Sequence, residues 1–196
     1  MKLFKDIRYR IFYGLFLNKN FPVASRGERA NGCAWNFSPD GLNSKSIIYG
    51  AGVGRDITFE RALVDEFKTS VVLIDPSPTG AETMAKQENK IPQFKFHPVG
   101  LAARCGTLKL SSPIDEQEGS WSGFSGKQAA LEVPTVDLQT LMRQNGHDYI
   151  DLLKLDIEGA EYEVMDDLLR KQIPIRQVLV EFHHGILPGF RRGQAA

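Results

Sequence analysis

The chain lacks an excess of charge, a cysteine pattern and a long hydrophobic run. Its 196 residues contain 24 Lys and Arg against 24 Asp and Glu, so total charge predicts no nucleic-acid partner. Cys33 and Cys105 lie far apart and match no metal-binding or redox spacing. No apolar run approaches the roughly 18 residues that cross a bilayer, and no cleavable secretory signal is recognisable. We therefore expect a cytoplasmic protein.

What is present suits one folded domain with an appendage. Hydrophobic residues make up 42% of the chain and charged residues 24%, as in ordinary globular proteins. Residues 1–20 have the pattern of a basic amphipathic helix. Residues 21–45 are rich in Gly, Asn, Ser and Pro and are expected to form an irregular connector. Residues 46–196 are expected to form the main domain.

The N-terminal segment is strongly basic. Residues 1–30 carry seven Lys or Arg against two acids. A helix of this kind packs on its own domain or on a second subunit, or it lies on an anionic membrane surface. The sequence leaves these options open. A homodimer and peripheral contact with the inner face of a membrane are therefore both retained as hypotheses.

Strand-like and helix-like segments alternate in the main domain. Short apolar runs such as "SVVLID" and "YIDLLKLDIEG" are separated by helical patterns such as "AEYEVMDDLLRKQ". Runs that are apolar throughout are typical of parallel strands covered on both faces. The prediction is an α/β fold, a Rossmann-like, doubly wound and mostly parallel sheet. Ligands of such sheets bind at the carboxyl ends of the strands.

A glycine-rich turn follows the first of these strands. Gly50, Gly52 and Gly54 form G-x-G-x-G, which leaves the backbone open to a ligand. A dinucleotide fingerprint needs a small residue where Arg55 stands, and no P-loop Gly-Lys follows. The next strand ends at Asp75, a carboxylate suited to ribose hydroxyls. This combination resembles the S-adenosylmethionine site of class I methyltransferases.

A second motif, "LLKLDIEGAEYEVM", narrows the resemblance. Together with "IDPSP" and "VEFHH", it resembles the FkbM-type methyltransferases over about residues 35–190. The resemblance implies an S-adenosylmethionine-dependent enzyme that methylates a hydroxyl of a sugar, polyketide or related small molecule or glycan. Class I enzymes add a helix and a strand pair after the fifth strand. Only 14 residues follow Phe182, so the sheet is expected to lack that pair.

The resemblance also implies roles for individual residues of the cofactor site. They fall at the ends of successive predicted strands. The methionine part of the cofactor would lie over the three glycines, and Asp75 would bind the ribose. Gly100 and Leu101 would border the adenine. Asp156 would face the methionine end or the acceptor.

Transfer to an alcohol also needs a group that takes up a proton. Glu158 and His183 are the candidate general bases, because both follow strands that end at the same edge. A divalent ion shared by Asp156, Glu158 and His183 is chemically allowed. Nothing in the spacing requires one, so no metal is predicted. The polar segment 111–128, with Trp121, is expected to be a lid or a surface excursion.

Two other functions are compatible with the same motifs. One is a degenerate cofactor-binding or scaffold protein that keeps the methyltransferase fold without turnover. The short C-terminal segment favours this alternative, whereas the intact glycine turn, Asp75 and Asp156 disfavour it. The other is a nicotinamide-dependent oxidoreductase, which Arg55 disfavours.

Overall fold

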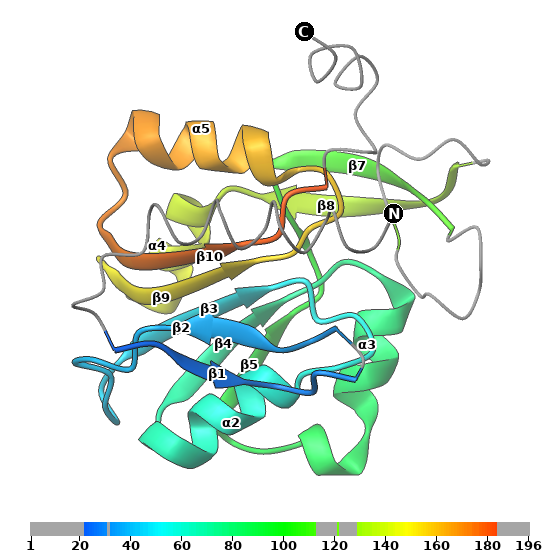
Figure 1. The fold of residues 1–196 in the computed structure, drawn as a ribbon. Helices are drawn as coiled ribbons and strands as arrows, with labels where there is room; N and C mark the ends of the chain where they lie inside the picture. The colour runs from blue at the N-terminus through cyan, green and yellow to red at the C-terminus, as the bar shows by residue number, and fades with distance from the viewer. Residues whose placement is uncertain (1–21, 31, 113–120, 122–128, 184–196) are drawn as a thin grey trace, which may run out of the picture.

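The computed structural model describes residues 22–30, 32–112, 121 and 129–183 (Figure 1). Three predictions therefore concern residues outside the described ones: the N-terminal helix over residues 1–20, the segment after His183, and most of the expected lid. Within the described ranges, no helix is both long and apolar enough to cross a membrane.

The core of the fold is a parallel sheet of five strands, and its order along the sheet is β10-β9-β3-β4-β5. The chain runs outward from β3 through β4 to β5 and then returns to the other side of β3. The direction of winding therefore reverses between β3 and β9, which is where sheets of this kind bind ligands. The predicted Rossmann-like, doubly wound sheet is confirmed. The strands are β3 (Ile47–Ala51), β4 (Ser70–Ile74), β5 (Phe94–His97), β9 (Ile150–Leu155) and β10 (Ile175–Val180).

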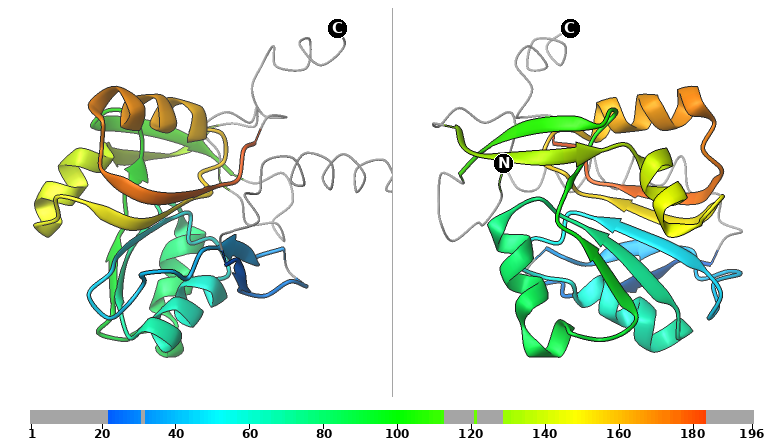
Figure 2. Two further views of the ribbon diagram at one scale, coloured as in Figure 1. Left: turned by 60° about the vertical axis from the view of Figure 1, so that its left-hand side comes forward. Right: turned by 180° about the vertical axis from the view of Figure 1, so that it is seen from behind.

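Helices cover both faces of this sheet (Figures 1 and 2). In β4, Val72 and Ile74 pack in the hydrophobic cluster that contains residues of α4 and α5. Val71 and Leu73 point the other way and pack with residues of α2. Burial on both faces explains why the strands are apolar at successive positions. The helices are α2 (Thr58–Phe67), α3 (Pro78–Ala85), α4 (Leu138–Asn145) and α5 (Glu161–Lys171), with a 3₁₀ turn η1 (Gln87–Asn89) after α3.

A smaller sheet, with strand order β6-β8-β7, stands beside the central one. β7 (Gly106–Ser111) and β8 (Ala129–Val136) pair antiparallel, and β6 (Gly100–Leu101) pairs parallel with the end of β8. β8 was not expected from the sequence. Figure 1 shows β7 and β8 extending beyond the carboxyl ends of the central strands, so this sheet forms a wall there.

The segment expected to be an irregular connector contains two paired strands. β1 (Ala24–Arg26) and β2 (Trp35–Phe37) form a two-stranded antiparallel sheet. Phe37 is buried against Phe59 of α2 in an edge-to-face contact, with ring centroids 5.7 Å apart. The pairing thus anchors the connector to the main core and brings Trp35 toward the carboxyl edge of the sheet.

Candidate active site

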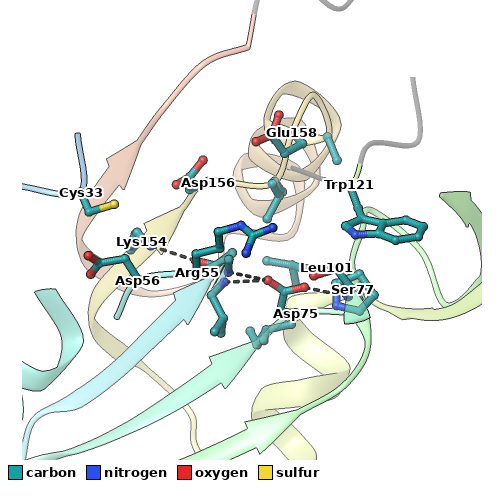
Figure 3. Close-up of a pocket in the computed structure, with 18 of the residues that line it drawn as sticks. Cys33, Arg55, Asp56, Asp75, Ser77, Leu101, Trp121, Lys154, Asp156 and Glu158 are labelled. Atoms are coloured by element: carbon teal, nitrogen blue, oxygen red, sulfur yellow. Dashed lines mark hydrogen bonds between the residues drawn. The ribbon is translucent and has the colours of Figure 1, made fainter. Parts of the chain in front are cut away.

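A cavity of about 630 Å³ opens at the carboxyl ends of β3, β4 and β9 (Figure 3). Most residues predicted to form the site line it: Gly52, Gly54, Asp75, Gly100, Leu101, Asp156 and Glu158. Gly50 does not line the cavity, because it lies within β3 and pairs with both neighbouring strands. The ring of His183 does not line the cavity but lies at its rim, next to Asp156 and Glu158.

The last two glycines of the turn serve different purposes. Gly52 has a φ of +89°, and a Cβ placed there would lie 1.8 Å from the carbonyl oxygen of Asp156. A side chain at Gly52 would therefore force the turn away from the end of β9. Gly54 also has a positive φ, +52°, but its Cβ would meet nothing within 4 Å. Its lack of a side chain leaves the cavity open.

Asp75 shapes the same turn from the end of β4. Its carboxylate is buried and accepts hydrogen bonds from the backbone N–H groups of Val53 and Gly54, both at 2.9 Å. Its other oxygen accepts from the N–H of Ser77 at 2.7 Å. A carboxylate has about four acceptor positions, so these three bonds leave one for a ligand hydroxyl. Asp75 therefore holds the glycine turn and can also bind a ligand there.

A buried ion pair lies beneath the turn, and the sequence analysis gave it no role. The ammonium of Lys154 lies 3.2 Å from a carboxylate oxygen of Glu60 and donates a hydrogen bond to the carbonyl of Gly52 at 2.9 Å. Burial alone would lower the pKa of Lys154, but the charges of Glu60 and Asp156 raise it, so the ammonium stays charged. Glu60 occupies the same helical stripe as Leu63 and Val64, and that position is the signal that it is buried.

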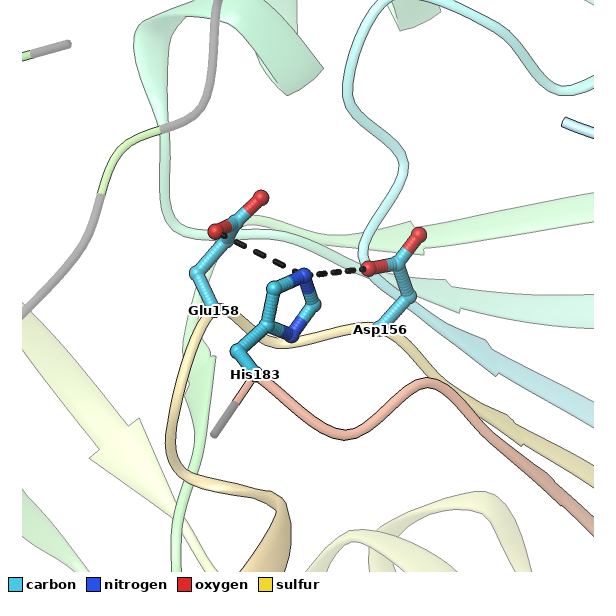
Figure 4. A group of neighbouring side chains, drawn as sticks. All are labelled: Asp156, Glu158 and His183. Atoms are coloured by element: carbon cyan, nitrogen blue, oxygen red, sulfur yellow. Dashed lines mark ion pairs between the residues drawn. The ribbon is translucent and has the colours of Figure 1, made fainter. Parts of the chain in front are cut away.

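A cluster of carboxylates surrounds His183 at the rim of the cavity (Figure 4). The ring Nε2 lies 3.8 Å from Asp156 Oδ1 and 3.7 Å from Glu158 Oε2. The Nδ1 atom is hydrogen-bonded to Glu161 Oε1 at 2.8 Å. Glu161 is fully buried and also accepts hydrogen bonds from the N–H groups of Ile157 and Gly159. Adjacent parallel strands, β9 and β10, thus bring together both candidate bases.

The electrostatics of this cluster favour a proton on His183. The hydrogen bond to Glu161, together with the charges of Glu158 and Asp156, raises the pKa of His183 to about 9, although burial opposes the shift. Burial raises the pKa of Asp156. It also raises the pKa of nearby Glu181, and the charges of Asp156 and Glu158 add to that shift. His183 must therefore lose a proton before it can act as a base at neutral pH.

The turn after β9 holds an unfavourable backbone conformation. Glu158 has a φ of +53°, in the left-handed region, and Gly159 follows at +110°. For a residue with a Cβ, this region costs about 1–2 kcal/mol. Such strain is found where the surrounding structure holds a side chain for a purpose. Here the turn presents Glu158 to the cavity (Figure 3).

Apolar side chains complete the wall. Leu108 and Leu110 of β7 line the cavity. Trp121, a described residue of the expected lid, lines it as well (Figure 3). Arg55, which separates this turn from a dinucleotide fingerprint, also lines the cavity. The arrangement combines an open glycine turn, a carboxylate at the neighbouring strand end, an acid–histidine rim and an apolar wall.

A protein-family model described as the methyltransferase FkbM domain matches residues 41–192. The chain belongs to the FkbM methyltransferase family. No curated protein and no solved structure matches it. The family match spans the glycine turn, Asp75 and the whole acid–histidine rim. It confirms the predicted family.

Proposed function

We propose that this FkbM-family protein is an S-adenosylmethionine-dependent methyltransferase that methylates a hydroxyl oxygen of a sugar, polyketide or related molecule. The observation that carries the proposal is the glycine turn, which opens into the cavity at the point where the sheet reverses its winding. Asp75 ends the next strand beside it. The family match supports a methyltransferase, and the rim geometry supports an acceptor that has to lose a proton.

The residues around the cavity fit the proposed cofactor. Its volume lies within the range of about 300–1,000 Å³ that is usual for ligand pockets. The backbone of Gly52–Gly54, the carboxylate of Asp75 and the β6 residues Gly100 and Leu101 would hold the molecule. When bound, S-adenosylmethionine supplies an electrophilic methyl group.

The remaining lining residues would handle the acceptor. Leu108, Leu110 and Trp121 provide an apolar wall that would limit the access of water once an acceptor is bound. Holding an acceptor oxygen in line with the methyl carbon removes much of the barrier to displacement. The acceptor hydroxyl would lose its proton at the rim, where Glu158 and His183 lie next to each other. Glu158 lines the cavity, whereas His183 does not line it and contacts the cavity wall through Asp156 and Glu158.

Calorimetric titration with S-adenosylmethionine and S-adenosylhomocysteine tests the cofactor site. We expect micromolar binding, and Asp75→Ala should weaken it at least about tenfold, or roughly 1.4 kcal/mol, because a buried acceptor is lost. Asp75→Asn keeps the size of the side chain and serves as a second variant. Glu82→Gln, an exposed acid on the adjacent helix α3, is the matched control and should bind like the unchanged protein.

A methyl-transfer assay with alcohol and amine acceptors tests the reaction class. Labelled methyl should appear in an alkali-stable ether of a sugar or polyketide alcohol. Tight cofactor binding without transfer to any acceptor would favour the scaffold alternative. If neither S-adenosylmethionine nor S-adenosylhomocysteine binds, the proposed function is overturned.

A further inference from the structure

We propose that Asp156, Glu158 and His183 bind one divalent cation of the Mn²⁺ or Mg²⁺ class at the rim of the cavity (Figure 4). Each residue offers one ligand atom, and the three atoms lie within 4.8 Å of one another. Asp156 and Glu158 follow β9, and His183 follows β10. The site is therefore positioned by two adjacent strands of the central sheet.

The distances suit a shared ion better than direct hydrogen bonds. His183 Nε2 lies 3.8 Å from Asp156 and 3.7 Å from Glu158, and both separations exceed the length of a hydrogen bond. Mg²⁺ holds its octahedral ligands at about 2.0–2.1 Å, so two of its ligand atoms lie roughly 3–4 Å apart. Small side-chain rotations would bring all three atoms onto one ion.

Glu161 orients the histidine for this role. Its fully buried carboxylate binds Nδ1 of His183 at 2.8 Å and is itself held by backbone N–H groups at the start of α5. This contact turns Nε2 toward the two rim carboxylates. Histidine ligands of metal ions usually have such a carboxylate on their other nitrogen, where it sets the tautomer and the ring orientation.

The local charges also favour a cation. Asp156, Glu158 and Glu161 surround a single imidazole, and Glu161 is fully buried. The nearest buried cation, Lys154, is already engaged with Glu60 and the carbonyl of Gly52. Three carboxylates around one imidazole leave a net negative charge even when His183 carries a proton, and a divalent cation would offset that charge.

The donor set predicts both the ion and its use. Two carboxylates and one imidazole suit Mn²⁺ or Mg²⁺ and leave further coordination positions for water or an acceptor oxygen. Asp156 and Glu158 line the cavity, so these positions face it. A hydroxyl bound to a divalent ion loses its proton more readily. This use of the ion rests on the proposed function, whereas binding of the ion does not.

Titration of the EDTA-treated protein with Mn²⁺, followed by electron paramagnetic resonance and calorimetry near pH 7.5, tests the site. We expect one ion per chain, bound with release of the Nε2 proton of His183 to the buffer and displaced by excess Mg²⁺. Asp156→Asn, Glu158→Gln and His183→Gln should each weaken binding at least about tenfold. Glu161→Gln should weaken it about 10–100-fold through the orientation of the ring. Glu163→Gln removes an exposed charge from the same helix turn and should leave binding unchanged.

Folding of each variant is checked by circular dichroism. If Asp156→Asn does not fold, the Mn²⁺ affinity of Glu158→Gln, a substitution at a partly exposed position, still tests the site. Equal Mn²⁺ affinity in the Glu158→Gln and unchanged proteins, or no binding below about 1 mM, would overturn the inference and assign the cluster to a protonated histidine among carboxylates. Binding of S-adenosylhomocysteine is measured on the same samples. Binding of S-adenosylhomocysteine without binding of Mn²⁺ would contradict the metal site alone. Binding of Mn²⁺ without binding of S-adenosylhomocysteine would contradict the proposed function alone.

Discussion

At the scale of single residues, the two positive-φ glycines of the turn differ in what a side chain would meet. Gly52 faces the carbonyl of Asp156, whereas Gly54 faces open space. The sequence presents both as members of one motif. The consequences of substitution should nevertheless differ, because one position carries a steric conflict in addition to the left-handed backbone.

Substitution of these glycines by alanine tests this difference. Gly54→Ala should lower the free energy of unfolding by about 1–2 kcal/mol, from the left-handed backbone alone. Gly52→Ala should lower the free energy of unfolding further and weaken binding of S-adenosylhomocysteine, because the turn has to move away from β9. Gly106→Ala is the control; its Cβ would have its nearest neighbour at 3.8 Å, and its φ is not positive. Urea denaturation measures all three, and equal losses for Gly52→Ala and Gly54→Ala would contradict the steric account.

The buried Lys154–Glu60 pair gives a second prediction for single residues. Lys154→Met should lower the free energy of unfolding by about 3–5 kcal/mol, because it leaves the carboxylate of Glu60 buried without its partner. The double variant Lys154→Met with Glu60→Leu should recover most of that loss. A double-mutant cycle from chemical denaturation measures the coupling. Additive losses in the cycle would show that the pair does not act as a unit.

At the scale of elements, one side chain links the start of α4 to the end of α5. Asp137 caps α4 by accepting a hydrogen bond from the N–H of Thr140, and it lies 3.1 Å from the ammonium of Lys171. Burial would raise the pKa of Asp137, but the hydrogen bonds from Thr140 and Lys171 hold it well below the usual value. The folded state therefore favours the ionised carboxylate.

This shift predicts how stability depends on pH. Because the pKa of Asp137 is lower in the folded state, its stabilisation is fully present above the unfolded value of 3.8 and is lost as the pH falls toward the folded pKa. Asp137→Ala should cost about 1–2 kcal/mol near neutral pH, through loss of the cap. Below pH 3.8 the difference should narrow. Thermal melts from pH 7 to pH 3 measure it, with exposed Asp148→Ala as the control; a gap that stays constant would contradict the assignment.

In the smaller sheet, the sequence pattern did not predict strand β8. β8 was not predicted, because "AALEVPTV" contains Pro134 and lacks a clear alternation. Proline is tolerated there because β6 pairs only with Thr135 and Val136, so at Pro134 the strand has β7 on one side alone. β7 is the preceding strand, but residues 112–128 separate it from β8, so no tight-turn signal identifies the pairing.

At the scale of the whole molecule, the site gathers segments that are distant in sequence. The turn after β3, the ends of β4 and β9, and β6 all meet at one cavity (Figure 3). A ligand that contacts all of them should stabilise the entire fold, since it binds the folded state and not the unfolded chain.

Thermal unfolding with bound S-adenosylhomocysteine measures how much ligand binding stabilises the fold. At a concentration of S-adenosylhomocysteine about 100 times its Kd, the free energy of unfolding should rise by about 2.7 kcal/mol. For a chain of this length, that corresponds to a rise in Tm of roughly 5–10 °C. AMP, which lacks the amino-acid part, is the control and should give a smaller shift. Equal rises in Tm for the two ligands would indicate that the site binds only the adenosine part of the molecule.

The sequence by itself determined the alternation of strands and helices, the glycine turn, Asp75 at the next strand end and the motif around Asp156. These features are set by residue type and short spacing, which local backbone physics converts directly into strands, turns and helices. The FkbM match confirmed the family that these motifs indicated.

Only the tertiary structure decided which side chains meet. It paired Lys154 with Glu60, placed Gly52 against the end of β9, and turned Nε2 of His183 toward Asp156 and Glu158. Each of these contacts joins residues on different elements. Such contacts depend on strand order and on how the helices pack across the sheet, and no periodicity within one segment encodes either.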